Sequence, residues 1–422
     1  MATRRQSLKL CEPLETEDFG VQPMADASPP KWHLAHTTWF FETFLLKPFV
    51  PGYQAFHPQF EHLFNSYYNG VGTPFPRPER GFLSRPTVAE VIAYREYVEA
   101  QLLTLLQAPD LAAVQQSNGA VRNQSDQEVL ARVTLGIHHE QQHQELLLTD
   151  LKYNFGHNPL YPVYAAGVLP EATTSYSAAH YVEHAGGVVD AGIDPSSGDF
   201  CFDNERPQHQ VLVQPFALAD RPVCNGEYLE FILDDGYQRA DLWLSEGWAA
   251  RGERNWRAPL YWREINGEWF EYRLDGLHPL RPDLPVVHVS AHEAWAYAAW
   301  TGQRLPTEFE WEVMARQQPV CGRFVEAGLF HPGPASRAPT NELCQLYGDV
   351  WQWTASSYSP YPGYKPLPGT LGEYNGKFMS SQLVLRGASC ATPQTHARPS
   401  YRNFFYPPDR WQFTGIRLAR DV

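Results

Sequence analysis

The chain has 422 residues, enough for two ordinary domains with cores of their own, and its 43% hydrophobic and 19% charged residues exclude a disordered protein. A net charge of −14 without any basic run disfavours a nucleic-acid partner. No stretch has the length of a membrane-spanning helix or the apolar core of a signal peptide, and the six cysteines form no C-x-x-C pair. We therefore expect a cytoplasmic protein that binds no membrane and keeps its cysteines reduced.

The first 155 residues are predicted to form a helical domain. One helix is expected at residues 17–24, and a second begins at Ser28-Pro29-Pro30 and ends before Pro48. A third helix follows Thr87, because Thr87 and Glu90 have the spacing of a capping box.

A fourth helix is predicted around the stretch HHEQQHQELLLTD, which continues an apolar pattern of helical period. Within it His139 and His143 stand at positions i and i+4, so they project from one helix face, as two ligands of a single metal ion would. Three or four helices with inward histidines predict a four-helix bundle.

A third candidate ligand, His36, lies on the second predicted helix. Three neutral imidazoles from two helices suit iron, zinc or copper. The alternative is a structural role, since a lone histidine on an amphipathic helix is more often a satisfied packing residue. His33, His62 and His138 compete for the ligand role, although His138 points about 100° away from His139 around the helix.

Residues 139–143 also spell H-E-x-x-H, the zinc protease signature, in which Glu140 would be the general base. The downstream extension with a further Gly and His is missing, because Leu146 and Thr149 stand at those positions. A zinc metallohydrolase is therefore the second reading of the same residues.

The chain changes character after the helical region. Residues 156–180 are rich in Pro, Gly and Ala and are predicted to be a linker. From 181 to 422 short apolar runs alternate with Gly/Pro turns, and two helices are expected, one after Ser290 with Glu293 and one after Thr307 with Glu310 as capping-box partners. The expected fold class is α+β, with much irregular structure in this second part.

Several motifs carry a resemblance to a known family. The C-terminal half contains FDNERPQHQV, GQRLPTEFEWEVMAR, GDVWQWT and RGASCATP, followed by SYRNFFYPPDRWQFTGIRLAR, and resembles the formylglycine-generating-enzyme-like, C-type-lectin fold. The N-terminal half, with W-x-L-A-H at 32–36 and H-x-x-x-H-x-E at 139–145, resembles the DinB-like helical bundle. Together and in this order, the two halves resemble the ergothioneine-biosynthesis sulfoxide synthases.

The resemblance implies a mononuclear non-haem Fe(II) enzyme. Such an enzyme uses dioxygen to join a cysteine-type thiol to the imidazole of hercynine, the trimethyl betaine of histidine, as a sulfoxide. Carried over to this chain, the iron ligands are His36, His139 and His143. Glu140 and Glu145 are candidates for accepting hydrogen bonds from the ligand imidazoles.

Two other readings come from the same resemblance. A formylglycine-generating oxidase would use a cysteine pair to bind copper, but Cys390 stands alone between Arg386 and Arg402. A lectin-like binding module without catalysis is disfavoured by the histidines of the first half.

The resemblance also suggests substrate-binding residues. Asn403 matches the residue that binds the hercynine carboxylate, and Phe404 and Phe405 follow it where one branch of the family has Trp-Asp. The Asp of that Trp-Asp pair belongs to the branch that uses gamma-glutamylcysteine. Because this chain has Phe405 in its place, the resemblance favours cysteine as the sulfur donor. Arg80 and Arg85 are candidates for the donor's carboxylate, with a surface position as the alternative.

Tyr67 and Tyr68 are the expected catalytic residues, because a phenol near the metal can donate a proton and a Tyr pair in a Gly-flanked loop is a poor way to build a core. Aromatic packing between the domains is the alternative. Further candidates are Tyr94, Tyr347 and Tyr406. A homo-oligomer is left open.

Overall fold

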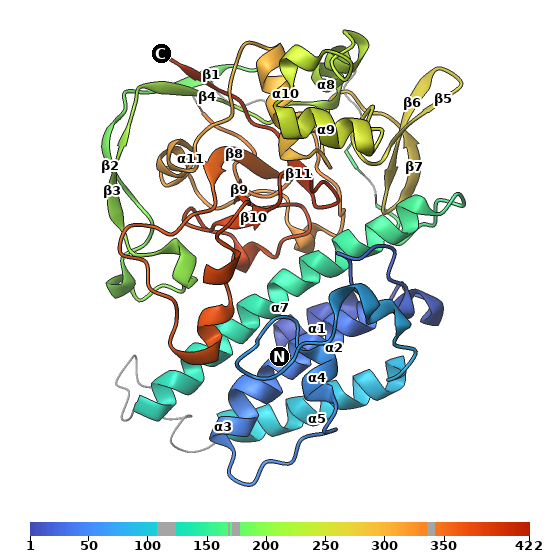
Figure 1. Cartoon of the computed structure of the whole chain (residues 1–422), viewed down its shortest axis with the longest axis vertical. Coiled ribbons are helices and arrows are strands. Elements are labelled where there is room, and N and C mark those ends of the chain that lie inside the picture. Colours follow the sequence, from blue (N-terminus) through green and yellow to red (C-terminus); the bar gives the residue numbers. More distant parts are fainter. Residues whose placement is uncertain (108–123, 168, 171–177, 336–341) are drawn as a thin grey trace. The chain divides into compact units, whose positions relative to one another are not determined.

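The computed structural model describes residues 1–107, 124–167, 169–170, 178–335 and 342–422 (Figure 1). They form two compact units. The first comprises Met1–Asn154 together with Pro368–Glu373, and the second comprises Phe155–Leu367 together with Tyr374–Val422. The short segment 368–373 therefore packs with the helical unit although it lies far along the chain.

The first unit is built from helices around one central element. Its helices are α1 (Ala2–Lys9), α2 (Pro30–Phe41), α3 (Lys47–Phe49), α4 (Phe60–Phe64), α5 (Val88–Leu106) and α7 (Gln124–His157), of which α7 ends in the second unit (Figure 1). Every residue of α2 is buried, and α2 packs against α4 and α5. A helix that is apolar or aromatic on most of its surface is expected at such a central place.

The predicted start of the third helix is confirmed. Thr87 Oγ1 accepts the N–H of Glu90 at 3.2 Å, and the Glu90 carboxylate accepts the N–H of Thr87 at 2.6 Å. The side chain of Thr87 thus satisfies an N–H that the first turn of α5 leaves without a helical partner.

Three features of this unit differ from the sequence prediction. The helix expected to end before Pro48 continues through a π turn, Glu42–Leu46, into α3, so the missing N–H of Pro48 falls at the start of a new turn, where it is tolerated. Residues 17–24 hold only a 3₁₀ helix, Thr16–Gly20. Helix α1 was not predicted, because its buried side chains are polar, namely Arg4 and Ser7.

The second unit contains four small sheets. Their strand orders are β1-β4-β12, β10-β9-β8-β11, β2-β3 and β5-β6-β7, and the described pairs are antiparallel except β11 with β8. The strands are β1 (Tyr181–His184), β2 (Gly187–Ala191), β3 (His209–Val213), β4 (Phe216–Ala219), β5 (Trp262–Ile265), β6 (Glu268–Arg273), β7 (Gly276–Pro279), β8 (Trp351–Ser357), β9 (Leu383–Gly387), β10 (Asn403–Phe405), β11 (Thr414–Gly415) and β12 (Ala419–Asp421).

The helices of the second unit are α8 (Asn225–Leu233), α9 (Ser245–Glu253), α10 (Ala291–Trp300) and α11 (Glu308–Ala315). Both predicted capping boxes are present, since Ser290 and Thr307 each accept the N–H three residues ahead at 3.1 Å. Helices α8 and α9 were not predicted. The helical first unit and the strand-rich second unit confirm the α+β class.

Part of the stretch expected to be a linker is tied to the second unit. Helix α7 continues to His157, and the N–H groups of Tyr164 and Ala165 both donate to the carbonyl of Leu274. Residues 168 and 171–177 of this stretch lie outside the described residues. Along the described chain, we find no helix whose length and apolar character would let it span a bilayer.

Candidate metal centre

Three histidines meet in the interior of the first unit. Helix α2 supplies His36, and α7 supplies His139 and His143, one turn apart as their spacing predicts. One ring nitrogen from each of the three lies within 4.8 Å of the other two. His36 and His139 are buried, whereas His143 keeps some exposure.

The ring of His36 is held by two stacked indoles and one hydrogen bond. The indoles of Trp32 and Trp39 stack on it, with ring centroids 4.6 and 5.4 Å away. Its Nδ1 lies 2.6 Å from the carbonyl oxygen of Phe64. A carbonyl only accepts, so Nδ1 carries the hydrogen and Nε2 keeps a lone pair. That Nε2 lies 3.2 Å from Nε2 of His139.

His33, a competing candidate, lies beside the cluster rather than in it. Its Nδ1 is 2.9 Å from Nδ1 of His143, and its Nε2 is 3.1 Å from Oδ2 of Asp150. His62 is exposed on α4, with Nδ1 2.7 Å from the carbonyl oxygen of Thr73. His138 is half-buried and does not belong to the cluster.

All three clustered imidazoles are held in the neutral form that binds a metal. Burial lowers the pKa of His36 and of His143 well below the ordinary range, and it lowers the pKa of His139 to about 3. The proton on His36 is directed to the carbonyl of Phe64, so its Nε2 turns a lone pair toward the other two rings, 3.2 Å from Nε2 of His139. The residues therefore fit a metal ion.

Glu140, the second residue of the H-E-x-x-H pattern, is directed to a different set of partners. Its carboxylate accepts from Arg95 at 2.7 Å, from Arg4 at 3.0 Å and from Ser7 at 2.7 Å. Burial alone would raise its pKa, but Arg95 and Arg4 hold the pKa of Glu140 at about 2. The expectation that Glu140 accepts from a ligand imidazole is wrong, because its oxygens are bound to the two guanidinium groups and the hydroxyl.

The two candidate arginines have opposite environments. Arg80 is 1% exposed, its guanidinium lies 3.4 Å from the centroid of the Trp32 ring, and it donates to the hydroxyls of Ser28 and Ser66. Its Nε has no hydrogen-bond partner among the described residues. Burial lowers the pKa of Arg80, the charge of Arg77 lowers it further, and the charge of Asp150 opposes both effects. Arg85 is exposed and donates to the carbonyl of Ser84, which is the surface position named as the alternative.

The loop that carries Tyr67 and Tyr68 is ordered by Asn65. The Asn65 amide donates to the carbonyls of Tyr68 and Gly72 and accepts the N–H of Tyr68. From the late segment of the same unit, Glu373 accepts the N–H groups of Asn69 and Gly70 at 3.0 and 2.8 Å. Nothing local in the sequence pointed to Glu373, which lies about three hundred residues away.

The tyrosine pair is less exposed than its sequence context suggested. Tyr68 is fully buried, with its ring 5.5 Å from Trp39 and 5.1 Å from Phe44, so this tyrosine does build core. Tyr67 is half-buried and stacks on Tyr68 at 4.6 Å. Because Trp39 also stacks on His36, Tyr68 is one ring removed from the histidine cluster.

The remaining candidates belong mainly to the second unit. Asn403, Phe404 and Phe405 form β10 and are half-buried. Asn403 Oδ1 accepts the N–H of Phe404, whose ring stacks on Tyr358 at 4.1 Å.

The three further tyrosine candidates have different environments. The hydroxyl of Tyr94 donates to Glu42, and that of Tyr347 donates to the carbonyl of Ala315. Tyr406 is exposed.

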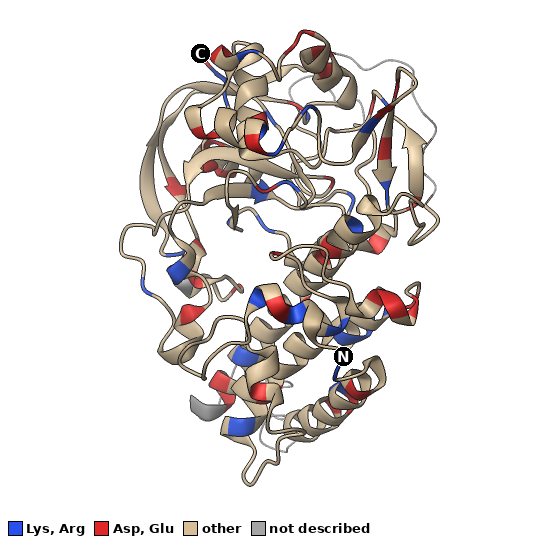
Figure 2. Ribbon diagram, turned by 45° about the vertical axis from the view of Figure 1, so that its right-hand side comes forward, with Lys and Arg blue, Asp and Glu red and all other residues tan. Residues whose placement is uncertain are grey.

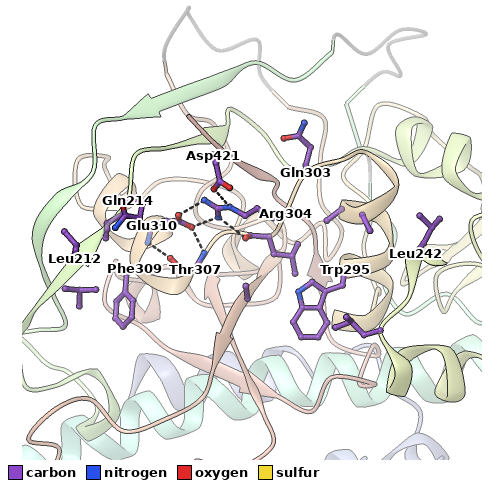
Figure 3. A pocket seen from close by; sticks show the side chains of 17 residues that line it. Leu212, Gln214, Leu242, Trp295, Gln303, Arg304, Thr307, Phe309, Glu310 and Asp421 are labelled. Atoms are coloured by element: carbon purple, nitrogen blue, oxygen red, sulfur yellow. Dashed lines mark hydrogen bonds and ion pairs between the residues drawn. The ribbon is translucent and has the colours of Figure 1, made fainter. Parts of the chain in front are cut away.

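The second unit contains a pocket of about 700 Å³ whose lining is mostly apolar and includes no histidine (Figure 3). Figure 3 shows Leu212, Leu242, Trp295 and Phe309 around it. The one arginine of its lining, Arg304, is already paired with Glu310 and Asp421 at 2.8 and 2.7 Å. No predicted site residue lines this pocket. In both units, Lys and Arg are interspersed with Asp and Glu along the described chain (Figure 2).

The two units match two family models. The DinB superfamily matches residues 2–147, and the sulfatase-modifying factor enzyme 1-like domain matches residues 166–422. Fold and site thus define a histidine-bearing helical unit joined to a domain of the formylglycine-generating type.

Two curated hercynine oxygenases are similar to this chain over nearly its whole length. The hercynine oxygenase of Mycolicibacterium smegmatis is 33% identical over 99% of this chain and 97% of its own. That of Mycobacterium tuberculosis is 33% identical over 94% of this chain and 91% of its own. Ergothioneine biosynthesis protein 1 of Schizosaccharomyces pombe is 29% identical over 53% of this chain and 28% of its own. The chain belongs to the hercynine oxygenase family and is an oxidoreductase, which confirms the resemblance seen in the sequence.

Proposed function

We propose that this enzyme is a non-haem Fe(II) sulfoxide synthase that couples hercynine to cysteine at the expense of dioxygen. The observation that carries the proposal is the meeting of three neutral imidazoles, from His36, His139 and His143, in a chain of this family. The reaction balances as thiol plus hercynine plus dioxygen giving the sulfoxide and water. The C–H and S–H hydrogens leave in the water, and one oxygen atom remains on sulfur.

Iron bound by the three histidines would supply open positions for the thiolate and for dioxygen, together with the electrons that activate dioxygen. The protein would hold the imidazoles neutral and fixed. Phe64 and the two indoles fix His36, and burial disfavours the second proton that would make any of the three rings cationic.

Glu140 is not available as the general base that a zinc hydrolase would need. A general base must be free to take a proton from water, but Glu140 is bound to Arg95 and Arg4 and its pKa is about 2. The arrangement of residues therefore supports oxidation over hydrolysis.

Arg80 is our candidate for binding the carboxylate of the sulfur donor. It is a buried cation that donates hydrogen bonds to two neutral hydroxyls, and a substrate carboxylate beside it would add a charge-assisted partner. Its stacking on Trp32, which itself stacks on His36, gives this cation a fixed place next to the histidines. Arg85 is exposed, so we propose Arg80 rather than Arg85 as the residue that binds the donor's carboxylate.

For hercynine we propose residues of the second unit. Asn403 would donate its amide to the carboxylate, and the rings of Phe404 and Phe405 would face the trimethylammonium group. The sequence Asn403-Phe404-Phe405 lacks the acid of the gamma-glutamylcysteine branch, so cysteine is the proposed donor. Tyr67 and Tyr68 are the proposed proton donors.

The test is anaerobic reconstitution with Fe(II), addition of oxygenated buffer, and mass spectrometry of the products formed from hercynine with cysteine or with gamma-glutamylcysteine. We expect the cysteine-derived sulfoxide. Failure of coupling with both donors would overturn the proposal, as would native zinc together with peptide hydrolysis that disappears in Glu140→Gln.

A further inference from the structure

A buried chain of side chains leads away from one of the three clustered histidines. His143 Nδ1 meets His33 Nδ1 at 2.9 Å, His33 Nε2 meets Asp150 Oδ2 at 3.1 Å, and Asp150 Oδ2 accepts the N–H of Ser28 at 2.8 Å. His33 is 3% exposed and Asp150 is 4% exposed. Both residues come from the helices that carry the cluster, α2 and α7.

The partners determine where each hydrogen lies. A carboxylate only accepts, so Nε2 of His33 carries the hydrogen that faces Asp150. With that hydrogen on Nε2, Nδ1 of His33 can accept, and the hydrogen between the two rings is assigned to Nδ1 of His143. This leaves Nε2 of His143 with its lone pair for a metal ion.

We propose that His33 and Asp150 are positioning residues that fix the tautomer and orientation of His143 and strengthen it as a ligand. This inference rests on the proposed function, since it assumes that the cluster binds a metal. Imidazole ligands commonly donate their second nitrogen to a carboxylate or a carbonyl, which orients the ring and raises its basicity. Here the carboxylate acts through an intervening imidazole.

The arrangement makes the ligands unequal. His36 donates to a main-chain carbonyl, which carries no formal charge, whereas His143 donates into a path that ends on a carboxylate. Of these two imidazoles, His143 is therefore the one whose electron donation is adjusted through side chains. Sequence spacing could not separate His33 from His36, because both lie on the same buried helix three residues apart.

The experiment measures Co(II) binding to the metal-free protein, since Co(II) reports nitrogen coordination through its visible absorption bands. We call the His33–Asp150 pair, through which His143 reaches a carboxylate, the relay. The variants are His33→Leu, which removes the relay imidazole, and Asp150→Asn, which keeps the shape of the side chain and removes its charge. His62→Gln, an exposed histidine of the same unit, is the control. Thermal unfolding of each metal-free variant shows whether the fold persists.

We expect His33→Leu to weaken Co(II) binding by roughly 10- to 100-fold and to shift the absorption bands. Asp150→Asn should weaken binding less than His33→Leu and keep the folded metal-free state, and His62→Gln should match the wild type. Wild-type affinity and bands in both relay variants would overturn the inference while leaving the metal site intact. A wild-type protein that binds no Co(II) would overturn it together with the proposed function. Relay-dependent Co(II) binding without any coupling activity would support the relay and count against the proposed reaction alone.

Discussion

Arg95 and Glu140 form an ion pair in the interior of the first unit, with Nη2 2.7 Å from Oε1 and both side chains 1% exposed. Arg4 joins the same carboxylate from α1, at 3.0 Å. Helix α1 is thereby held against α7 by an ion pair rather than by apolar packing. The residue that a zinc protease would use as its base is here a structural anchor.

Glu140→Gln should destabilise the protein rather than remove a catalytic group. Breaking a buried ion pair from one side leaves uncompensated guanidinium charge and costs about 3–5 kcal/mol of unfolding free energy. Urea unfolding measures this loss, and a matched Glu128→Gln change at an exposed position of α7 should be nearly neutral. Coupling activity per bound metal should persist, and a variant that folds normally but has lost all coupling would contradict this assignment.

Local signals in the sequence predicted the fold class and several helix starts. The capping boxes at Thr87, Ser290 and Thr307 are interactions within one turn, so the sequence alone reveals them. The spacing of His139 and His143 predicted their common face for the same reason. Helix α1 gave no such signal, because its partners are distant charges.

The parts of the site that depend on distant residues could not be predicted. The role of His33 depends on Asp150, and the order of the tyrosine loop depends on Glu373, neither of which any local pattern connects to them. The burial of Tyr68 follows from rings on other segments, Trp39 and Phe44. Only tertiary packing distinguishes a phenol in a loop from a phenol in a core.

Removing one clustered imidazole should nearly abolish metal binding. In His36→Ala only two imidazoles remain, and they hold Fe(II) poorly. Anaerobic equilibrium dialysis followed by metal analysis should show sharply reduced occupancy, whereas His138→Ala, one position away from His139, should bind as the wild type does. Full iron occupancy in His36→Ala would rule out the ligand assignment.

Arg80→Met should raise the KM for cysteine by roughly 10- to 100-fold, because a charge-assisted hydrogen bond contributes about 1.5–3 kcal/mol. Comparing cysteine with cysteamine, which is cysteine without its carboxylate, shows whether the effect of the variant depends on the carboxylate. The wild type should prefer cysteine strongly, and Arg80→Met should lose most of that preference. Arg85→Met is the control, since Arg85 is exposed. If Arg80→Met still prefers cysteine as strongly as the wild type, the carboxylate binds elsewhere.

The acid stability of the second unit should depend on Glu308. Its carboxylate accepts from Arg386 at 2.8 Å and from Arg402 at 2.9 and 3.0 Å. Burial alone would raise the pKa of Glu308, but the two arginines hold it below the ordinary 4.5. A depressed carboxyl pKa stabilises the fold above pH 4.5, and this stabilisation is lost as the pH falls through the folded-state value.

Glu308→Gln should therefore unfold more easily than the wild type at neutral pH, by about 3–5 kcal/mol, and the difference should shrink below pH 4.5. Chemical unfolding at a series of pH values measures both effects, with the exposed Glu264→Gln as control. A difference that stays constant from pH 7 to pH 3 would show that the charge of Glu308 is not its source.

The last prediction concerns the tyrosine loop. If Tyr67 or Tyr68 supplies a proton during coupling, loss of that hydroxyl should leave substrate binding intact and slow the productive path. Dioxygen could then oxidise the thiol alone, a balanced reaction in which cysteine takes up both oxygen atoms as the sulfinate. The change to Phe keeps each ring, so the stacking of Tyr67 on Tyr68 and of Tyr68 against Trp39 should survive. We expect at least one of Tyr67→Phe and Tyr68→Phe to shift the product from sulfoxide toward cysteine sulfinate, measured by mass spectrometry at equal iron occupancy. Tyr272→Phe, at a buried position of the second unit, is the control for a lost phenol hydrogen bond. Native rates and product ratios in both loop variants would place the donor elsewhere in the chain.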